Sequence, residues 1–404
     1  MKARRVQVPS LLGDPGIRRV KTPERRFLFA APPLDGPVTA GVAVAAELAR
    51  RGHKVAWTGH RPSLEPRLRP GSRIFSAVEE DFEKRMHGIR SDWLDLRGLA
   101  ALRFLWEEFL VPLGHAMLPG VEKALDRFRP DVVIADQHAL AAPVAARRRE
   151  LPWATSAATS AEFARPLAAM PKVEEWVRDQ IAGFQLEHGI DDLLDLRFSD
   201  HLVLAFSPGG LIGDISFFPD HFAFVGPAPG RPAPRAFPWD RLDGRPAVLI
   251  TMNDPSAARF VRVAAEAVRG LDVQAIIVAP PGVPADPPPN ALVQERVPEH
   301  KLLEHVAAVV CDGAHDTVCA SLSNGLPLVA APSRDDQPVI ARQVEAAGAG
   351  VQVRNARCGA DELRTALTAV LTDGRYRSAA ERVRETITAA GGVTEAADRL
   401  EKLA

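Results

Sequence analysis

The sequence predicts an α/β protein made of two Rossmann-like, doubly wound domains, each built on a parallel sheet. Short apolar runs typical of buried parallel strands alternate with segments whose apolar residues recur at helical spacing. This alternation stops at a Pro- and Gly-rich stretch, residues 226–234, and then starts again. The length of 404 residues suits two domains of ordinary size.

The predicted N-terminal domain spans residues 27–226. An apolar strand over 26–31 is broken by residues 32–37, and a helix over 38–51 leads to a strand over 53–58. A strand–helix–strand opening implies a right-handed crossover and a parallel sheet. The alternation continues with predicted strands at 131–135 and 153–156 and predicted helices at 92–110, 121–128, 140–149 and 173–196.

A predicted linker over residues 227–246 leads to a C-terminal domain over 247–404. Its predicted strands are 248–251, 273–278, 307–311 and 328–331, and its predicted helices are 256–269, 316–324, 338–347, 360–371 and 375–403. We expect the final helix to be able to pack back on the N-terminal domain. Ligands of doubly wound sheets bind beyond the carboxyl ends of the strands, so two such domains predict a deep cleft between them.

Composition excludes several classes of protein. Hydrophobic residues make up 46% and charged residues 25%, so the chain is neither disordered nor fibrous. Its 50 Lys and Arg balance 51 Asp and Glu, which gives no electrostatic reason to expect nucleic acid or a membrane as partner. No apolar run reaches the roughly 18–20 residues that cross a bilayer. We expect a soluble cytoplasmic protein.

The cysteines and the N-terminus support the same expectation. Cys311, Cys319 and Cys358 are too few and too scattered for a disulfide framework or a structural zinc site, and we expect no bound metal. We expect Cys311 and Cys319 to be small buried hydrophobic residues. Residues 1–26 mix Arg, Lys, Pro and Gly without an apolar segment, which predicts a flexible tail and not a signal peptide.

The most specific motifs lie in the second half of the chain. The run 309–317 ends a strand and starts a helix, and the run 332–338 does so again one strand later, with Gly325-Leu-Pro327 between them. Helix N-termini of this kind form anion sites. The ordered set resembles the nucleotide-sugar-dependent glycosyltransferases of the GT-B fold, specifically the family 1 enzymes that decorate bacterial secondary metabolites. The resemblance extends from residue 26 to the C-terminus.

The resemblance implies a catalytic base that this chain lacks. In such enzymes a His directly after a Gly takes the proton from the acceptor hydroxyl, and an Asp orients that His. Here Gly36 is followed by Pro37, which has no titratable group, and the orienting residue matches Asp136. Asp35 is the nearest ionisable replacement, and His138 follows the same strand as Asp136. Their structural alternatives are an Asx-turn or helix cap for Asp35 and a loop role for His138.

The resemblance also implies changes where the sugar donor binds. The family motif His-Gly-Gly, whose His and backbone amides hold the diphosphate, corresponds to Asp312, Gly313 and Ala314. One carboxylate about 4 Å from a phosphate charge costs on the order of 4 kcal/mol at an effective dielectric near 20. The family's Gly-Thr or Gly-Ser turn corresponds to Met252, Asn253 and Asp254, which places a side chain at the glycine position.

Other donor-side residues match the family. Thr317, Asp336 and Gln337 correspond to residues that contact phosphate and sugar hydroxyls. His315 also matches a common family residue, with helix capping as its structural alternative. Three changed motifs on an intact scaffold suggest a changed function.

We therefore expect an enzyme of secondary metabolism that binds a natural-product small molecule and catalyses a cyclisation, elimination or isomerisation without glycosylation or a cofactor. Its candidate catalytic residues are Asp35, Asp136, His138, Asp312 and His315. One alternative is an active glycosyltransferase that uses a nucleotide sugar, a carboxylate base and an unusual donor or bridging metal. Another is a non-catalytic auxiliary subunit of a partner enzyme. The sequence leaves the substrate open and is compatible with a homodimer.

Overall fold

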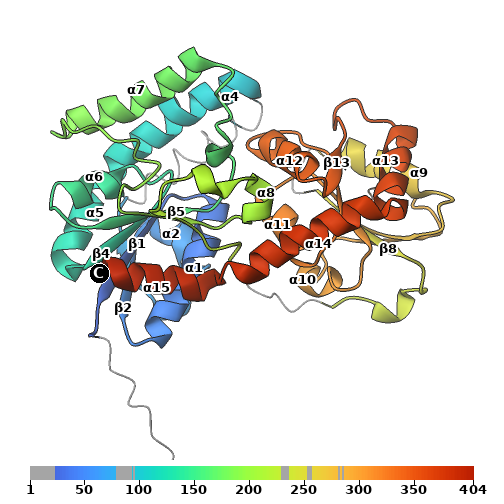
Figure 1. The fold of residues 1–404 in the computed structure, drawn as a ribbon, viewed down its shortest axis with the longest axis horizontal. Coiled ribbons are helices and arrows are strands. Elements are labelled where there is room, and N and C mark those ends of the chain that lie inside the picture. Colours follow the sequence, from blue (N-terminus) through green and yellow to red (C-terminus); the bar gives the residue numbers. More distant parts are fainter. Residues whose placement is uncertain are drawn as a thin grey trace, which may run out of the picture.

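The computed structural model describes residues 23–78, 93, 96–228, 236–252, 257–280, 283 and 286–404, and for residues 35–37 and 164 it describes the backbone alone. Two α/β domains lie side by side, each with helices on both faces of a parallel sheet (Figure 1). This confirms the predicted fold class. Most of the predicted tail, residues 1–22, and residues 229–235 of the predicted linker lie outside the described residues.

The N-terminal sheet has seven parallel strands in the order β3-β2-β1-β4-β5-β6-β7. The chain first adds strands on one side of β1 and then crosses to β4, so the topological switch point lies between β1 and β4. The strands are β1 (Arg26–Ala31), β2 (Lys54–Gly59), β3 (Arg73–Ser76), β4 (Val132–Asp136), β5 (Trp153–Ala157), β6 (Leu202–Ala205) and β7 (Phe222–Phe224).

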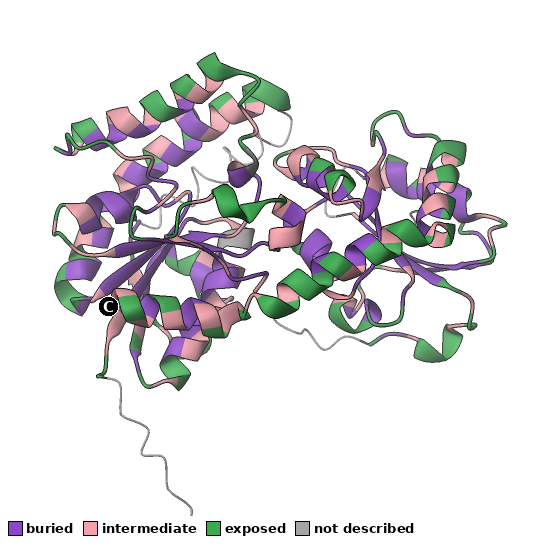
Figure 2. Ribbon diagram, viewed as in Figure 1, coloured by how far each residue is buried: buried purple, intermediate pink, exposed green. Residues whose placement is uncertain are grey.

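Helices cover both faces of this sheet, and the inner strands β1, β4, β5 and β6 between them are almost entirely buried (Figure 2). Leu28 and Val133 pack towards α5 and α6, whereas Phe29 and Ile134 pack towards α1. The helices are α1 (Asp35–Arg50), α2 (Arg61–Leu64), α4 (Gly98–Phe104), α5 (Val111–Phe128), α6 (Ala141–Arg147), α7 (Pro171–Glu187) and α8 (Gly209–Ile212), with a π-helical segment, Leu105–Leu110, between α4 and α5. Single 3₁₀ turns are Glu162–Ala164 and Ile215–Phe217.

The C-terminal sheet has six parallel strands in the order β10-β9-β8-β11-β12-β13, with its switch point between β8 and β11. The strands are β8 (Ala247–Thr251), β9 (Gln274–Val278), β10 (Ala291–Gln294), β11 (Ala308–Cys311), β12 (Leu328–Ala330) and β13 (Gly350–Gln352). The helices are α9 (Ala258–Val268), α10 (Glu299–Leu302), α11 (His315–Ser323), α12 (Gln337–Ala346), α13 (Ala360–Thr372), α14 (Gly374–Ala389) and α15 (Gly392–Leu403), and a 3₁₀ turn, Trp239–Arg241, precedes β8. Cys311, Cys319 and Cys358 are all buried free thiols, as predicted for the first two.

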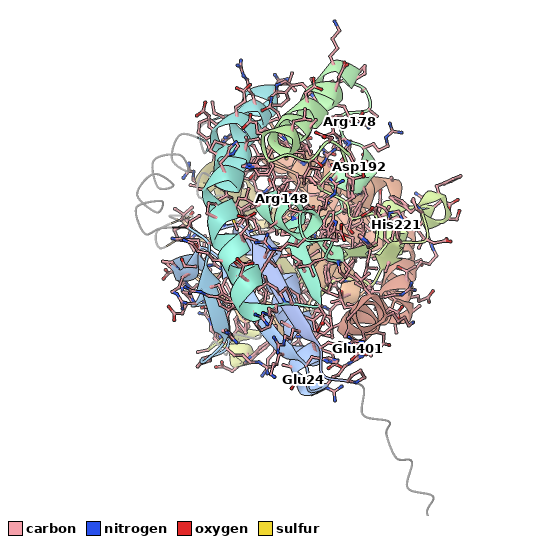
Figure 3. The ribbon with its side chains drawn as sticks, turned by 90° about the vertical axis from the view of Figure 1, so that its left-hand side faces the viewer. Glu24, Arg148, Arg178, Asp192, His221 and Glu401 are labelled. Carbon is pink, nitrogen blue, oxygen red and sulfur yellow. The ribbon has the colours of Figure 1, made fainter. Side chains whose placement is uncertain are left out.

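The last helix, α15, packs on the N-terminal domain. Ala396, Ala397 and Leu400 belong to the same buried cluster as Val44 of α1. His53 Nε2 lies 2.8 Å from Glu401 Oε1, and Figure 3 shows Glu401 at the same end of this sheet as Glu24. The last helix therefore forms part of the core of the first domain.

Four of the predicted helices differ clearly from the observed ones. Within the described part of the helix predicted over 92–110, α4 begins only at Gly98, and residues 105–110 are π-helical. The helix predicted over 375–403 is two helices, because Gly391 has a left-handed φ of 80° that ends the first. The helix predicted over 173–196 ends at Glu187. The helix predicted over 121–128 is the end of α5, which begins at Val111 directly after the π-helical segment. Pro112 falls in the first turn of α5, where its missing N–H costs little.

Within the described part of the chain, no helix combines the length and the apolar character that crossing a membrane requires.

Candidate functional site

Asp136 ends β4 at the carboxyl edge of the N-terminal sheet, and its side chain is only 4% exposed. Its Oδ1 atom accepts a hydrogen bond from the backbone N–H of His138 at 2.9 Å, and Nδ1 of the half-buried His138 lies 3.8 Å from the same oxygen. Because the chain turns directly after the strand, the structure brings these two predicted residues together.

The surroundings of Asp136 change its proton affinity. Burial raises the pKa of Asp136 from 3.8 to about 6, although the His138 imidazole and the backbone N–H groups of His138 and Gln137 act in the opposite direction. A carboxyl group with a pKa near 6 can take up and release a proton close to neutral pH.

Three more polar groups at this sheet edge were not predicted from the sequence. Thr58 Oγ1, Gln137 Nε2 and Ser156 Oγ are buried and have no hydrogen-bond partner among the described residues. Buried polar groups are normally paired, so unpaired ones at one edge of a sheet are typical of a place where a ligand binds. A polar residue near the end of an otherwise apolar strand, as at Thr58 and Ser156, is the signal that could have found them.

Ser156 and Asp136 share one face of the sheet. They are in-register partners on β5 and β4, and neighbours in parallel register point to the same side. Ile134, two residues before Asp136 on that side, packs against α1. The carboxyl group and the unpaired hydroxyl group therefore both lie on the α1 side.

The predicted residues of the first loop lie at the start of α1. The helix begins at Asp35 with Leu34 at the N-cap position, so Asp35 is not the N-cap residue, and Pro37 lies in the first turn. The side chains of both residues are outside the described part of the structure. A catalytic role for Asp35 therefore stays a prediction.

On the C-terminal domain, Asp312 follows β11 and is fully buried. Its Oδ1 atom accepts a hydrogen bond from the backbone N–H of Ala314 at 3.1 Å, directly before α11. Gly313 between them has a left-handed φ of 79°, and a Cβ there would lie 3.2 Å from the carbonyl oxygen of Gln337. The glycine lets this turn lie close against the start of α12.

Acidic groups gather at the start of α11. Burial raises the pKa of Glu299, and repulsion from Asp316 and Asp312 raises it further. Burial also raises the pKa of Cys311 to about 12, again with a contribution from Asp312. The Asp312 and Asp316 carboxyl groups therefore lie close enough to Glu299 to oppose its ionisation.

His315 is the first residue of α11 and is buried. Its Nε2 atom lies 2.8 Å from Ser207 Oγ of the N-terminal domain and 3.4 Å from Cys319 Sγ. Burial opposes the charged imidazole, but Cys319 and Asp316 outweigh burial and raise the pKa of His315. His315 therefore forms a hydrogen bond with Ser207 across the boundary between the two domains.

The other donor-side candidates also have partners within the protein. Asp336 Oδ2 accepts a hydrogen bond from Thr159 Oγ1 at 2.6 Å, and Gln337 Oε1 accepts one from the Ser333 N–H at 3.0 Å. Thr317 is buried in α11. Met252 is half-buried and packs against the core behind β8, whereas Asn253 and Asp254 lie outside the described residues.

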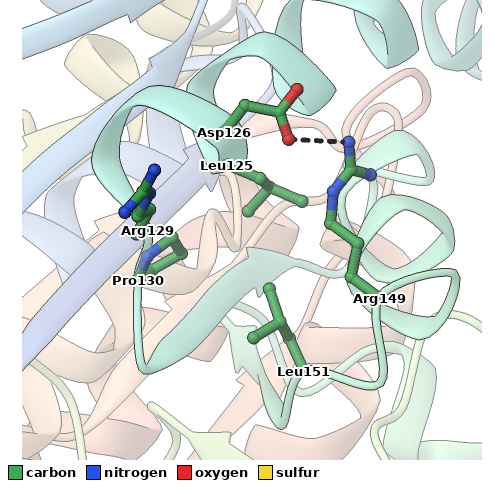
Figure 4. A pocket seen from close by; sticks show the side chains of 6 residues that line it. All are labelled: Leu125, Asp126, Arg129, Pro130, Arg149 and Leu151. Carbon is green, nitrogen blue, oxygen red and sulfur yellow. Dashed lines mark hydrogen bonds and ion pairs between the residues drawn. The ribbon is translucent and has the colours of Figure 1, made fainter.

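The predicted residues that the structure describes thus form two groups, one at the carboxyl edge of each sheet. A cavity of about 370 Å³ lies elsewhere, where β4 begins, and is lined by Leu125, Asp126, Arg129, Pro130, Arg149 and Leu151 (Figure 4). It is at the opposite end of β4 from Asp136, so it is separate from the candidate site. Within the described ranges, no cluster of three or more His, Cys, Asp or Glu side chains could hold a metal ion.

Relatives of known activity cover almost the whole chain. Residues 258–403 match the erythromycin biosynthesis protein CIII-like C-terminal domain. The 4'-demethylrebeccamycin synthase of Lentzea aerocolonigenes is 26% identical over 94% of this chain and 99% of that protein. The demethyllactenocin mycarosyltransferase of Streptomyces fradiae is 28% identical over 92% of this chain and 85% of its own length.

Solved structures show the same fold. The calicheamicin glycosyltransferase CalG4 matches with a TM-score of 0.75 and 22% identity, over 94% of this chain and 98% of its own. The kitacinnamycin glycosyltransferase matches with a TM-score of 0.74 and 22% identity, over 94% and 99% of the two chains. By its C-terminal domain, its relatives and its fold, the chain is a homologue of the family 1 glycosyltransferases of natural-product type, built on the GT-B fold.

Proposed function

We propose that this chain binds a natural-product small molecule and catalyses a non-glycosylating acid/base reaction on it, either a cyclisation, an elimination or an isomerisation. The observation that carries the proposal is the place of Asp312. A buried carboxylate already accepts the N–H of Ala314, one of the backbone groups that hold the donor diphosphate in the family this chain resembles.

The charges around Asp312 support the absence of a sugar donor. The imidazole of His315, whose raised pKa favours its charged form, already contacts Ser207. Asp312 and Asp316 both oppose the ionisation of Glu299, so carboxyl groups gather at the start of α11. A diphosphate at the start of α11 would add at least two negative charges to this group. Even about 3 kcal/mol of repulsion weakens binding roughly a hundredfold.

The groups around Asp136 support acid/base chemistry. With a pKa of about 6, Asp136 is mostly ionised at pH 7 and serves as the base, and its protonated form can return the proton. Ser156 Oγ and Gln137 Nε2 lack partners among the described residues, so they are available to bind a hydroxyl or carbonyl oxygen of the substrate. His138, beside Asp136, is the second group to which we assign proton transfer.

Titration calorimetry with UDP, dTDP, GDP and dTDP-glucose tests the donor side of the proposal. We expect no binding to the wild-type protein at millimolar nucleotide. Asp312→Asn keeps an oxygen for the Ala314 N–H and removes the charge, and Asp312→His restores the family residue, so both should bind more tightly. Asp361→Asn, which removes an exposed carboxylate of α13 outside this cluster, is the matched control. Micromolar binding to the wild-type protein would contradict the proposal.

The second candidate function is glycosyl transfer with Asp136 as the base. It is favoured by the glycosyltransferase relatives and by the retained Thr317, Asp336 and Gln337. The same titration separates the two functions, because glycosyl transfer requires that a nucleotide sugar binds.

A further inference from the structure

Hydrogen bonds join the two domains where the donor-side candidates lie. Thr159 Oγ1 donates to Asp336 Oδ2 at 2.6 Å, and Ser207 Oγ lies 2.8 Å from His315 Nε2. Thr159 and Ser207 follow the carboxyl ends of the neighbouring strands β5 and β6. Their partners lie at the first turns of α12 and α11. These hydrogen bonds therefore link the carboxyl edge of the N-terminal sheet to the carboxyl edge of the C-terminal sheet.

A third contact lies beside these two. Ser160 Oγ donates to Gln343 Oε1 at 2.6 Å, and Gln343 Nε2 donates to the Ser160 carbonyl oxygen at 3.4 Å. Ser160 and Ser207 are both fully buried. A hydrogen bond that is shielded from water on both sides holds its geometry more firmly than an exposed one.

Apolar packing surrounds the polar contacts. Ala161 and Leu211 of the N-terminal domain belong to the same buried cluster as Ile340 and Val383 of the C-terminal domain. α8, which follows β6, lies against α12 and α14 (Figure 1). The boundary between β5–β6 and α11–α12 is therefore a packed interface in this structure.

We infer that Thr159 and Ser207 are specificity-determining residues that hold Asp336 and His315 against the N-terminal domain and so exclude an activated sugar. The resemblance assigns Asp336 to sugar hydroxyls and matches His315 to a common donor-side residue, and here each has its hydrogen bond within the protein. This inference deepens the proposed function and rests on it. A nucleotide sugar can reach these side chains only after the interface opens.

The test uses the double variant Thr159→Val and Ser207→Ala in the full chain. Valine keeps the shape of threonine and removes the hydroxyl group. The conservative variant Thr159→Ser keeps the hydroxyl and should behave as the wild-type protein does. Ser216→Ala removes an exposed hydroxyl whose bond to Asp214 lies within one domain, and it is the matched control.

The first measurement is hydrogen exchange of the first turn of α12, with the unfolding temperature recorded for every variant. Residues 158–163 are left out, because the Ala161 N–H donates to Thr159 Oγ1 at 3.3 Å and would lose that bond in the variant itself. We expect at least tenfold faster exchange in the double variant and no change in the two others. Equal exchange in the double variant and the wild-type protein would overturn the inference. If the double variant does not fold, the single variants Thr159→Val and Ser207→Ala are measured in its place, with the same expectation and a smaller change.

The second measurement is calorimetry with dTDP-glucose in the Asp312→Asn background, so that the Asp312 carboxylate does not mask a gain. If Thr159→Val and Ser207→Ala make Asp312→Asn bind dTDP-glucose at least tenfold more tightly, the exclusion of the donor by the interface is supported. Faster exchange without this gain would overturn the exclusion. Micromolar binding of dTDP by the wild-type protein would contradict the proposed function, and the exchange result would then still decide whether Thr159 and Ser207 hold the interface.

Discussion

Asp136 and Ser156 are in-register neighbours on the parallel strands β4 and β5, so a buried carboxyl group and a buried hydroxyl group share one face of the N-terminal sheet. The Ser156 hydroxyl has no partner among the described residues, and burial makes ionisation of Asp136 costly. Both features lower the stability of the fold. Groups that are kept at a cost to stability are typical of functional sites.

Replacing Asp136 with Asn should stabilise the protein at high pH. Because burial raises the pKa of Asp136 from 3.8 to about 6, the folded state binds this proton more tightly than the unfolded chain. The wild-type protein therefore loses stability as the pH rises from about 4 to about 6. This pKa change corresponds to a loss of about 3 kcal/mol in the free energy of unfolding. In urea unfolding, we expect Asp136→Asn to gain up to that amount at pH 8 and nothing at pH 4. An equal gain at both pH values would show that Asp136 is not the titrating group.

Ser156→Ala should also stabilise the fold, by about 1 kcal/mol, because it removes a buried hydroxyl that lacks a partner. Ser160→Ala is the matched control: this buried hydroxyl donates to Gln343, and its loss should destabilise the protein by a similar amount. Thermal and urea unfolding measure both variants. A loss of stability in Ser156→Ala would mean that the hydroxyl group has a partner.

Turnover should depend on Asp136. The compound that accumulates when the gene is deleted from its source organism should be converted by the pure wild-type protein, with a kcat/KM that rises around pH 6. Loss of a general base typically costs about 10²–10⁴-fold, so Asp136→Asn should lose at least a hundredfold. Mass spectrometry should find a product of unchanged mass or one that has lost water. A product heavier by one sugar residue would establish glycosyl transfer.

The C-terminal helix should be needed for the stability of the first domain. Leu400 is fully buried in the N-terminal core, so Leu400→Ala should destabilise the protein by about 2–5 kcal/mol. Lys402→Ala, at an exposed position of the same helix, should change the stability by less than about 0.5 kcal/mol. Urea unfolding followed by tryptophan fluorescence compares them. Equal effects of the two variants would show that α15 does not support the core.

The central strands of both sheets could be predicted from the sequence, because a strand buried on both faces is an uninterrupted apolar run. β1, β4, β8 and β11 are of this kind. The four edge strands, β3, β7, β10 and β13, were not predicted. They are three or four residues long and only partly buried, so their apolar pattern is too short to separate from a loop. The inner strand β6 was also missed, although it is apolar throughout.

The candidate site could be predicted only where its residues are close together along the chain. Asp136 and His138 flank one turn after a predicted strand, and Asp312 begins a recognisable strand-to-helix turn. The contacts of Thr159 with Asp336 and of Ser207 with His315 join residues more than 100 positions apart. These contacts depend on how the two domains pack together, and the spacing of residues along the sequence does not predict that.

The place of α15 has a consequence for biosynthesis. Residues 392–403 complete the apolar layer next to α1, so the first domain keeps an uncovered surface while the ribosome is still translating the second. The first domain therefore completes its core only after residues 392–403 have left the ribosome.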